Sequence, residues 1–228
     1  MRSVKYAVLI DLDGTLADTA PDLAASVDIM LRRLGRNTVG EARVRDWVGN
    51  GIEVLVARAL GEDVTTELHQ RALGLFTPAY RANNGRHAGL YPGVRRGLNR
   101  LSELGIPLAC VTNKPRAFTL PLLSTLGIRN RFAAVVCGDD TPAKKPDPAP
   151  LHHALELLGA PVNRALFVGD SVHDVEAARR AGLKVVCVPY GYNHGEDVAL
   201  SRPDGIIESL VDVESHLSAL LDATRGSP

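Results

Sequence analysis

The chain has 228 residues, and its 26 lysines and arginines are balanced by 26 aspartates and glutamates. This length suits one α/β domain with a small accessory domain, and the zero net charge excludes a surface dominated by attraction to nucleic acid or anionic lipid. No apolar run approaches the roughly 20 residues that span a bilayer, and the N-terminus lacks the features of a secretory signal. We therefore expect a cytoplasmic protein that binds neither nucleic acid nor membranes.

A short apolar run, Val4–Ile10, predicts a buried strand near the start of the chain. The next stretch, from about residue 15 to residue 86, contains helical patterns such as Asp22–Leu34 and Gly51–Leu60 but no strong strand. Polar or Gly- and Pro-rich segments at both ends of this stretch are typical of hinges. The predicted domains are therefore a helical cap over residues 16–86 and a core over residues 1–15 and 87–228.

Strands and helices alternate through the rest of the chain. Apolar runs predict strands at Leu108–Thr112, Ala133–Cys137, Ala165–Val168 and Lys184–Val188, with a weaker candidate at Ile206–Ile207. Helical periodicity predicts helices at Gly93–Leu104, Phe118–Leu126, Ala149–Leu158, Asp174–Ala181 and Val213–Leu221. A glycine follows each of the first four helices, where it favours a left-handed helix end. The nearly continuous apolar runs are typical of strands buried on both faces, so we predict an α/β fold with a Rossmann-like, doubly wound parallel sheet.

The three cysteines, Cys110, Cys137 and Cys187, are far apart and lie in apolar runs. An odd number of separated cysteines without C-x-x-C spacing indicates buried thiols in a reducing compartment. The histidines have no metal-ligand spacing with them, so a zinc or redox site is not expected.

The first predicted strand leads directly into Asp11-Leu12-Asp13-Gly14-Thr15. Its two carboxylates would project from the carboxyl end of that strand, which is the edge where open α/β sheets bind ligands. Taken alone, the segment also fits an ordinary turn with an Asp-Gly corner. The later motifs favour a functional site.

Three further polar motifs lie at strand ends or in the loops beyond them: Val111-Thr112-Asn113-Lys114, Lys144-Lys145-Pro146-Asp147-Pro148 and Val168-Gly169-Asp170-Ser171-Val172-His173-Asp174. Because a parallel sheet gathers the carboxyl ends of its strands at one rim, six side chains should meet there: Asp11, Asp13, Thr112, Lys145, Asp170 and Asp174. Crowded carboxylates repel one another unless a cation or protons neutralise them, and hard oxygen ligands favour Mg²⁺. The sequence therefore predicts a magnesium site on this rim.

The four motifs, DxDGT, a strand-end Thr, a Lys before Pro and GDSxxD, resemble those of the haloacid dehalogenase superfamily of phosphatases, and the match spans nearly the whole chain. Three longer runs, Asp11–Leu23, Trp47–Leu60 and Lys145–Leu151, are similar to those of the bacterial phosphoglycolate phosphatases. The resemblance implies a Mg²⁺-dependent phosphatase that hydrolyses a small phosphate ester through an aspartyl-phosphate. It makes 2-phosphoglycolate the leading substrate and a monomer or homodimer the expected assembly.

The resemblance also implies roles in catalysis. Asp11 would be the nucleophile, and Asp13 would protonate the leaving group and then take a proton from the attacking water. Lys145, Thr112 and the backbone of Asn113 would bind the transferred phosphoryl oxygens. Lys145 is preferred over its neighbour because the family pattern places the catalytic amine directly before proline.

For the metal, the resemblance implies a site built from the first and last of these motifs. Mg²⁺ would be held by the Asp11 carboxylate, the Asp13 backbone carbonyl and the Asp170 carboxylate. Asp174 would act beside them, fixing a water molecule or Lys145.

The helical insert would be a mobile cap that excludes water and reads the rest of the substrate. Gly49-Asn50-Gly51 opens a predicted helix whose amide groups could meet an anion, and Arg58 could pair with a carboxylate. The same residues also fit an ordinary turn and a solvated helix face. Asn50, Gly51 and Arg58 are therefore candidate substrate-binding residues.

Several alternatives stay open. Within the superfamily, the substrate could be pyrophosphate or a sugar phosphate, as for β-phosphoglucomutase. Phosphonoacetaldehyde hydrolase is disfavoured because no lysine between Lys5 and Lys114 could form its Schiff base, and a dehalogenase is disfavoured because Asp13 is present. From another class, a phospho-signalling receiver domain also clusters aspartates, Thr and Lys, but it is shorter and has no cap. A non-catalytic relative that only binds phosphorylated ligands is the remaining alternative.

Overall fold

The computed structural model describes residues 6–62 and 64–222. Its strands are β1 (Ala7–Ile10), β2 (Ala17–Asp18), β3 (Gly89–Leu90), β4 (Leu108–Val111), β5 (Ala134–Val136), β6 (Ala165–Gly169), β7 (Lys184–Cys187) and β8 (Gly205–Ile206). Its α-helices are α1 (Ala20–Arg33), α2 (Glu41–Arg45), α3 (Ile52–Leu60), α4 (Thr66–Asn83), α5 (Val94–Glu103), α6 (Arg116–Thr125), α7 (Ala149–Leu158), α8 (Val172–Ala181) and α9 (Val213–Asp222). Short 3₁₀ helices are η1 (Arg129–Arg131), η2 (Val162–Arg164), η3 (Asn193–Gly195), η4 (Val198–Ser201) and η5 (Leu210–Asp212).

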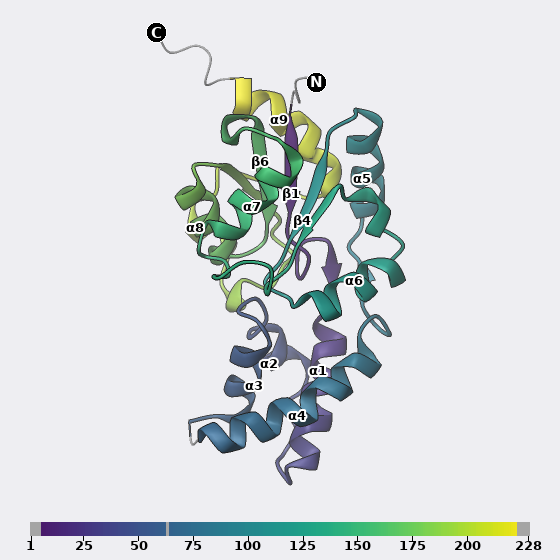
Figure 1. The fold of residues 1–228 in the computed structure, drawn as a ribbon, viewed down its shortest axis with the longest axis vertical. Coiled ribbons are helices and arrows are strands. Elements are labelled where there is room, and N and C mark those ends of the chain that lie inside the picture. The colour runs from purple at the N-terminus through teal and green to yellow at the C-terminus, as the bar shows by residue number, and fades with distance from the viewer. Residues whose placement is uncertain (1–5, 63, 223–228) are drawn as a thin grey trace.

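A parallel sheet with the strand order β5-β4-β1-β6-β7-β8 forms the upper part of the molecule in Figure 1. All four residues of β1, Ala-Val-Leu-Ile, are buried, as expected for a central strand covered on both faces. Its neighbours β4 and β6 are buried along their whole length as well. Both of these central pairs run parallel, so the carboxyl ends of β1, β4 and β6 meet at one rim.

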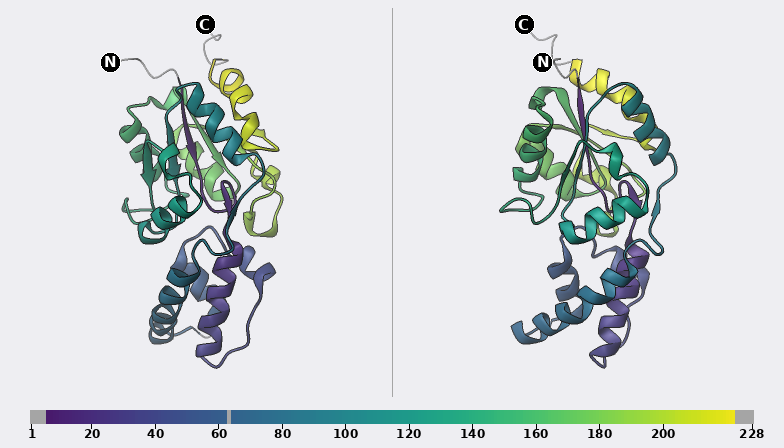
Figure 2. Two further views of the ribbon diagram at one scale, coloured as in Figure 1. Left: turned by 90° about the vertical axis from the view of Figure 1, so that its right-hand side faces the viewer. Right: turned by 45° about the vertical axis from the view of Figure 1, so that its right-hand side comes forward.

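Helices cover both faces of this sheet (Figure 2). On one face, α5 and α9 pack with side chains such as Leu98 and Leu217 against Val8 of β1. On the other face, α7 and α8 pack with side chains such as Leu151 against Phe167 of β6. The two separate apolar clusters confirm the predicted doubly wound α/β class.

The helices α1–α4 form a separate helical cap below the rim of the sheet (Figure 1). They pack around a third apolar cluster, which contains Met30, Phe76 and Tyr80 of the cap and also Phe118 and Tyr192 of the core. The antiparallel pair β2-β3 connects the cap to the core at the point where the chain enters and leaves it. Here the buried carboxylate of Asp22 accepts hydrogen bonds from the backbone N–H groups of three residues of the returning segment, Gly85, His87 and Ala88.

The predicted elements agree with the structure to within a few residues. Each predicted strand of the core forms, including the weak candidate, which becomes β8, although Val4 and Lys5 lie outside the described residues. Gly105, Gly127, Gly159 and Gly182 follow their helices with φ between 61° and 74°, as predicted. The cysteines are buried free thiols. No helix in the described part of the chain has the length and apolar character needed to cross a bilayer.

Candidate active site

The turn after β1 places two aspartates at the rim. The Asp11 backbone N–H donates to the carbonyl of Val168 and so continues the ladder of β1 with β6. The chain then turns at Gly14, whose φ is +90° and whose missing Cβ would lie 2.3 Å from a carboxylate oxygen of Asp170. Only glycine fits both the backbone conformation and this close approach. The turn therefore brings the DxDGT segment against the end of β6.

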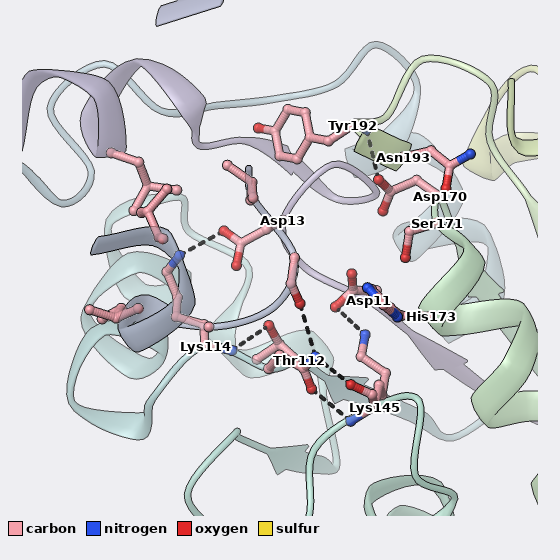
Figure 3. Close-up of a pocket in the computed structure, with 17 residues that line it drawn as sticks. Asp11, Asp13, Thr112, Lys114, Lys145, Asp170, Ser171, His173, Tyr192 and Asn193 are labelled. Carbon is pink, nitrogen blue, oxygen red and sulfur yellow. Dashed lines mark hydrogen bonds and ion pairs between the residues drawn. The ribbon is translucent and has the colours of Figure 1, made fainter. Parts of the chain in front are cut away.

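Three buried carboxylates meet beside this turn. Asp11, Asp170 and Asp174 each offer an oxygen atom, and these atoms lie within 4.8 Å of one another. Asp170 is held on both sides, because one of its oxygens accepts from Thr15 Oγ1 at 2.6 Å and the other from the Tyr192 N–H at 2.9 Å. Figure 3 shows the carboxylates of Asp11 and Asp170 facing the same space. This cluster has the oxygen donors that a hard divalent cation requires.

Lys145 lies between two of these carboxylates. Its Nζ is 2.8 Å from Asp11 Oδ1 and 2.7 Å from Asp174 Oδ1, and it also donates to the Val111 carbonyl at 3.1 Å. The contact with Asp11 is an ion pair, whereas Asp174 accepts a full hydrogen bond. The second oxygen of Asp174 accepts from the Ser171 side chain and from two backbone N–H groups at the start of α8. Asp174 is thus fully engaged in fixing Lys145 and the α8 N-terminus.

The electrostatics of the cluster favour a bound cation. Burial raises the pKa of Asp11 to about 7, although Lys145 opposes the shift. Burial, together with repulsion from Asp174 and Asp11, raises the pKa of Asp170 well above its ordinary value. Burial lowers the pKa of Lys145, but the carboxylates Asp11 and Asp174 outweigh this effect and leave it raised. A cation bound beside Asp11 and Asp170 would lower their raised pKa values and so favour their ionised forms.

Asp13 lies on the other side of the turn and lines the same cavity. One of its oxygens accepts from Thr19 Oγ1 at 2.5 Å and from Lys114 Nζ at 2.7 Å. With Asp13 included, four carboxylates meet the two ammonium groups of Lys114 and Lys145, which leaves two negative charges in excess when all are ionised. That excess matches the charge of one divalent cation.

Thr112 and Asn113 follow β4 at the same rim. The Thr112 hydroxyl accepts from the Lys114 N–H, so part of its hydrogen-bonding capacity is used locally. The Asn113 side chain binds both the N–H and the carbonyl of Lys145, at 2.9 Å each. It also donates to the Gly49 carbonyl of the cap at 2.9 Å. Asn113 therefore connects the lysine loop to the cap.

The three cap candidates occupy different positions. Gly51 lines the cavity at the N-terminus of α3, and its φ is +92°. Asn50 makes a contact of 2.8 Å between its Nδ2 and His173 Nε2 of the core. Arg58 donates to the Trp47 carbonyl at 3.0 Å and is not among the described residues that line the cavity.

The cavity between the rim and the cap measures about 40 Å³ and has lining residues that the sequence did not single out. Its apolar wall comes from Leu23, Val48, Ile52 and Leu55 of the cap. Its polar wall includes Lys114, Ser171, His173, Tyr192 and Asn193. A signal for the last two existed, because they lie in the loop beyond β7, which ends at the same rim.

Comparison with known proteins decides the family. The model of the haloacid dehalogenase-like hydrolases matches residues 8–188. The chain belongs to this family. The matched segment contains all four motifs of the site, from Asp11 after β1 to Asp174 in α8, whereas Tyr192 and Asn193 lie just beyond it.

Individual relatives in this hydrolase family are similar over almost their full length. The phosphoglycolate phosphatase of Nitrosococcus oceani is 47% identical over 92% of this chain and 96% of its own. That of Nitrosospira multiformis is 48% identical over 90% of this chain and 92% of its own. Among solved structures, a predicted phosphoglycolate phosphatase from Haemophilus somnus has a TM-score of 0.88 and 34% identity, covering 95% of this chain and 99% of its own. CbbY from Rhodobacter sphaeroides, solved in complex with phosphate, has a TM-score of 0.77 and 26% identity over 91% of this chain and 95% of its own.

Proposed function

We propose that this hydrolase is a Mg²⁺-dependent phosphatase that converts 2-phosphoglycolate to glycolate and phosphate through a phosphorylated Asp11. The observation that carries the proposal is the position of Asp11, 2.8 Å from the Lys145 ammonium and inside a cluster of buried carboxylates. The choice of substrate follows the relatives that are 47% and 48% identical, which are named phosphoglycolate phosphatases.

In the first step, a carboxylate oxygen of Asp11 attacks phosphorus, the ester P–O bond breaks, and an aspartyl-phosphate forms. Lys145 stands beside the attacking oxygen, held there by Asp174, so its charge can stabilise the transferred phosphoryl oxygens. Thr112 and the backbone of Asn113 lie at the end of the adjacent strand β4 and would bind the same oxygens. Placing these groups before the substrate arrives lowers the reorganisation that the reaction requires.

Asp13 serves the leaving group. It lines the cavity two residues beyond Asp11 and is not engaged with Lys145. It donates a proton to the departing alkoxide oxygen of glycolate and in the second step takes one from the water that hydrolyses the aspartyl-phosphate. The second step returns Asp11 to its free carboxylate and releases inorganic phosphate.

The site fits Mg²⁺ because it combines buried hard oxygen donors with two excess negative charges when all four carboxylates are ionised. The Asp11 and Asp170 carboxylates and the Asp13 backbone carbonyl would hold the ion, while Asp174 positions Lys145. When bound, the ion supplies positive charge to the phosphoryl oxygens. Gly14 and Gly191 support this assignment, since a Cβ at either position would lie within 2.3 Å of an Asp170 atom and displace its carboxylate.

Residues 16–86 form the cap in this proposal and close over the substrate, excluding water from the aspartyl-phosphate. Asn50 and Gly51 lie where the cap meets the rim, whereas Arg58 is directed to Trp47. The buried free thiols fit a reducing compartment, so we place the enzyme in the cytoplasm, as a monomer or homodimer.

A substrate panel tests the proposal. We expect kcat/KM for 2-phosphoglycolate to exceed that for pyrophosphate and for hexose phosphates by at least about tenfold in the presence of Mg²⁺. Equal kcat/KM values would contradict the assignment of 2-phosphoglycolate as the substrate, but they would not contradict the assignment as a phosphatase. Absence of phosphate release from every compound in the panel would overturn the proposed reaction.

A further inference from the structure

A second buried ammonium group, that of Lys114, lines the cavity in addition to Lys145. The residue is 6% exposed, and its Nζ lies 2.7 Å from Asp13 Oδ1 and 5.2 Å from the centre of the Tyr80 ring. Keeping an ammonium group away from water is unfavourable unless other groups compensate for its charge. A role in solubility or surface charge therefore does not explain why Lys114 is buried in this cavity.

The two lysines of the cavity have different surroundings. Lys145 has three oxygen partners, because it donates hydrogen bonds to Asp174 and to the Val111 carbonyl and forms an ion pair with Asp11. In the described part of the chain, Lys114 has one carboxylate partner, Asp13, and its other neighbour is Tyr80, whose ring and hydroxyl lie beside the ammonium group. Figure 3 shows the two lysines approaching the two aspartates from different sides. With Asp13 and the Tyr80 hydroxyl as partners, the ammonium group keeps one of its three donors for a ligand.

The location of this ammonium group specifies the part of the substrate that it can reach. Under the proposed function, Asp11 attacks phosphorus and Asp13 faces the departing oxygen. Since Lys114 contacts Asp13 and not Asp11, its charge lies on the leaving-group side of the cavity. The neighbouring cap wall, built from Leu23, Val48, Ile52 and Leu55, is apolar and cannot solvate an anion.

We propose that Lys114 binds the carboxylate of the leaving group and so makes the enzyme select phosphate esters of small hydroxy acids. The inference rests on the proposed phosphatase function and deepens it. Lys114 keeps one donor on Asp13 and gives another to the substrate carboxylate. Arg58, which the sequence suggested for this task, is bonded to Trp47 and does not line the cavity within the described chain.

The test compares two esters that differ at one position, 2-phosphoglycolate and 2-hydroxyethyl phosphate, in which a hydroxymethyl group replaces the carboxylate. We expect Lys114→Met to lower the ratio of their kcat/KM values by at least about tenfold, mainly through a higher KM for 2-phosphoglycolate. Lys114→Arg, which keeps a positive charge, should retain most of the preference. Lys144→Met is the matched control, because Lys144 pairs with Glu53 outside the cavity lining, and it should leave the ratio unchanged.

The outcomes separate the two proposals. If Lys114→Met slows both esters equally, Lys114 only supports Asp13, and the inference is overturned while the phosphatase function stands. If the wild-type enzyme hydrolyses neither ester, the proposed function itself fails. If the melting curve shows that Lys114→Met does not fold, Lys114→Gln is tested with the same two esters. In addition, the inhibition constants of glycolate and ethylene glycol as competitive inhibitors of the wild type are compared. Equal inhibition by the two alcohols would overturn the inference.

Discussion

The rim of the sheet and the cap loop that faces it, residues 46–51, are built in different ways. On the rim, Asp11, Lys145, Asp170 and Asp174 are each less than a tenth exposed, and most of them are bound by several partners. The cap loop is only partly buried, and it reaches the core through individual hydrogen bonds such as Asn50–His173. A densely bonded rim is arranged before substrate binds, whereas a loop held by few bonds can open and close.

This comparison predicts that changes on the rim act on the chemical steps and that changes in the cap loop act on binding. The largest effect is expected for Asp11→Asn, since an amide cannot form the acyl phosphate. We expect kcat to fall by at least about 10³-fold, measured as phosphate release under saturating substrate. The melting temperature should not fall, because burial disfavours the Asp11 carboxylate and raises its pKa to about 7. Turnover at the wild-type rate would remove Asp11 from the role of nucleophile.

Asp13→Asn should have the next largest effect, because it removes proton transfer but leaves the nucleophile in place. A loss of about 10²- to 10⁴-fold in kcat is expected from the absence of general acid–base catalysis. Rapid-quench measurements with radiolabelled substrate should show that the phosphoenzyme forms poorly and hydrolyses slowly. A variant whose phosphoenzyme forms and decays at wild-type rates would place the acid–base group elsewhere.

Asp170→Asn tests the cation site by a measurement that does not depend on activity. At a Mg²⁺ concentration about 100 times its Kd, binding should stabilise the wild type by about 2.7 kcal/mol, or roughly 5–10 °C in Tm for a chain of this size. The variant should lose most of this shift. In chelator it should melt no lower than the wild type, because burial already disfavours the Asp170 carboxylate and raises its pKa.

The control for this experiment is Asp139→Asn. Asp139 belongs to a second group of possible ligands, with Cys137 and Asp140, and it accepts a hydrogen bond from the Arg116 N–H at the start of α6. Arg116 already compensates for this group through its pair with Asp140, so no cation is required there. A Tm shift that disappears in Asp139→Asn and persists in Asp170→Asn would reverse the assignment.

The same contrast explains how far the sequence could predict the structure. Asp11 and Asp170 directly follow strands, and a parallel sheet brings the carboxyl ends of its strands together, so these two could be grouped from their positions. The loop after β5 offers two lysines, and the choice of Lys145 depended on the resemblance to the family. The cap loop follows no strand. Its place over the rim depends on how α1–α4 pack around an apolar cluster that also includes Phe118 and Tyr192 of the core, which a local pattern does not specify.

Two cap residues show the consequence. Gly51 and Arg58 lie at opposite ends of α3, seven residues apart, which corresponds to roughly 10 Å along a helix. One can therefore line the cavity while the other is bonded to Trp47. Sequence alone could not decide which end of α3 faces the rim. For Tyr192 the loop after β7 indicated a place near the rim, but its packing into the cap cluster depends on tertiary structure that the local sequence does not specify.

The smallest effect is expected in the cap loop, for Asn50→Ala. This change removes the contact with His173 and leaves the rim intact. Loss of one hydrogen bond of about 0.5–1.5 kcal/mol should raise KM for 2-phosphoglycolate by about 2- to 10-fold, with kcat little changed. Asn37→Ala is the matched control, because it makes the same substitution at an exposed position between α1 and α2 and should leave both constants at wild-type values. If Asn50→Ala instead lowers kcat as strongly as the rim variants and leaves KM unchanged, the cap loop takes part in the chemical step, and the division between a catalytic rim and a binding loop does not hold.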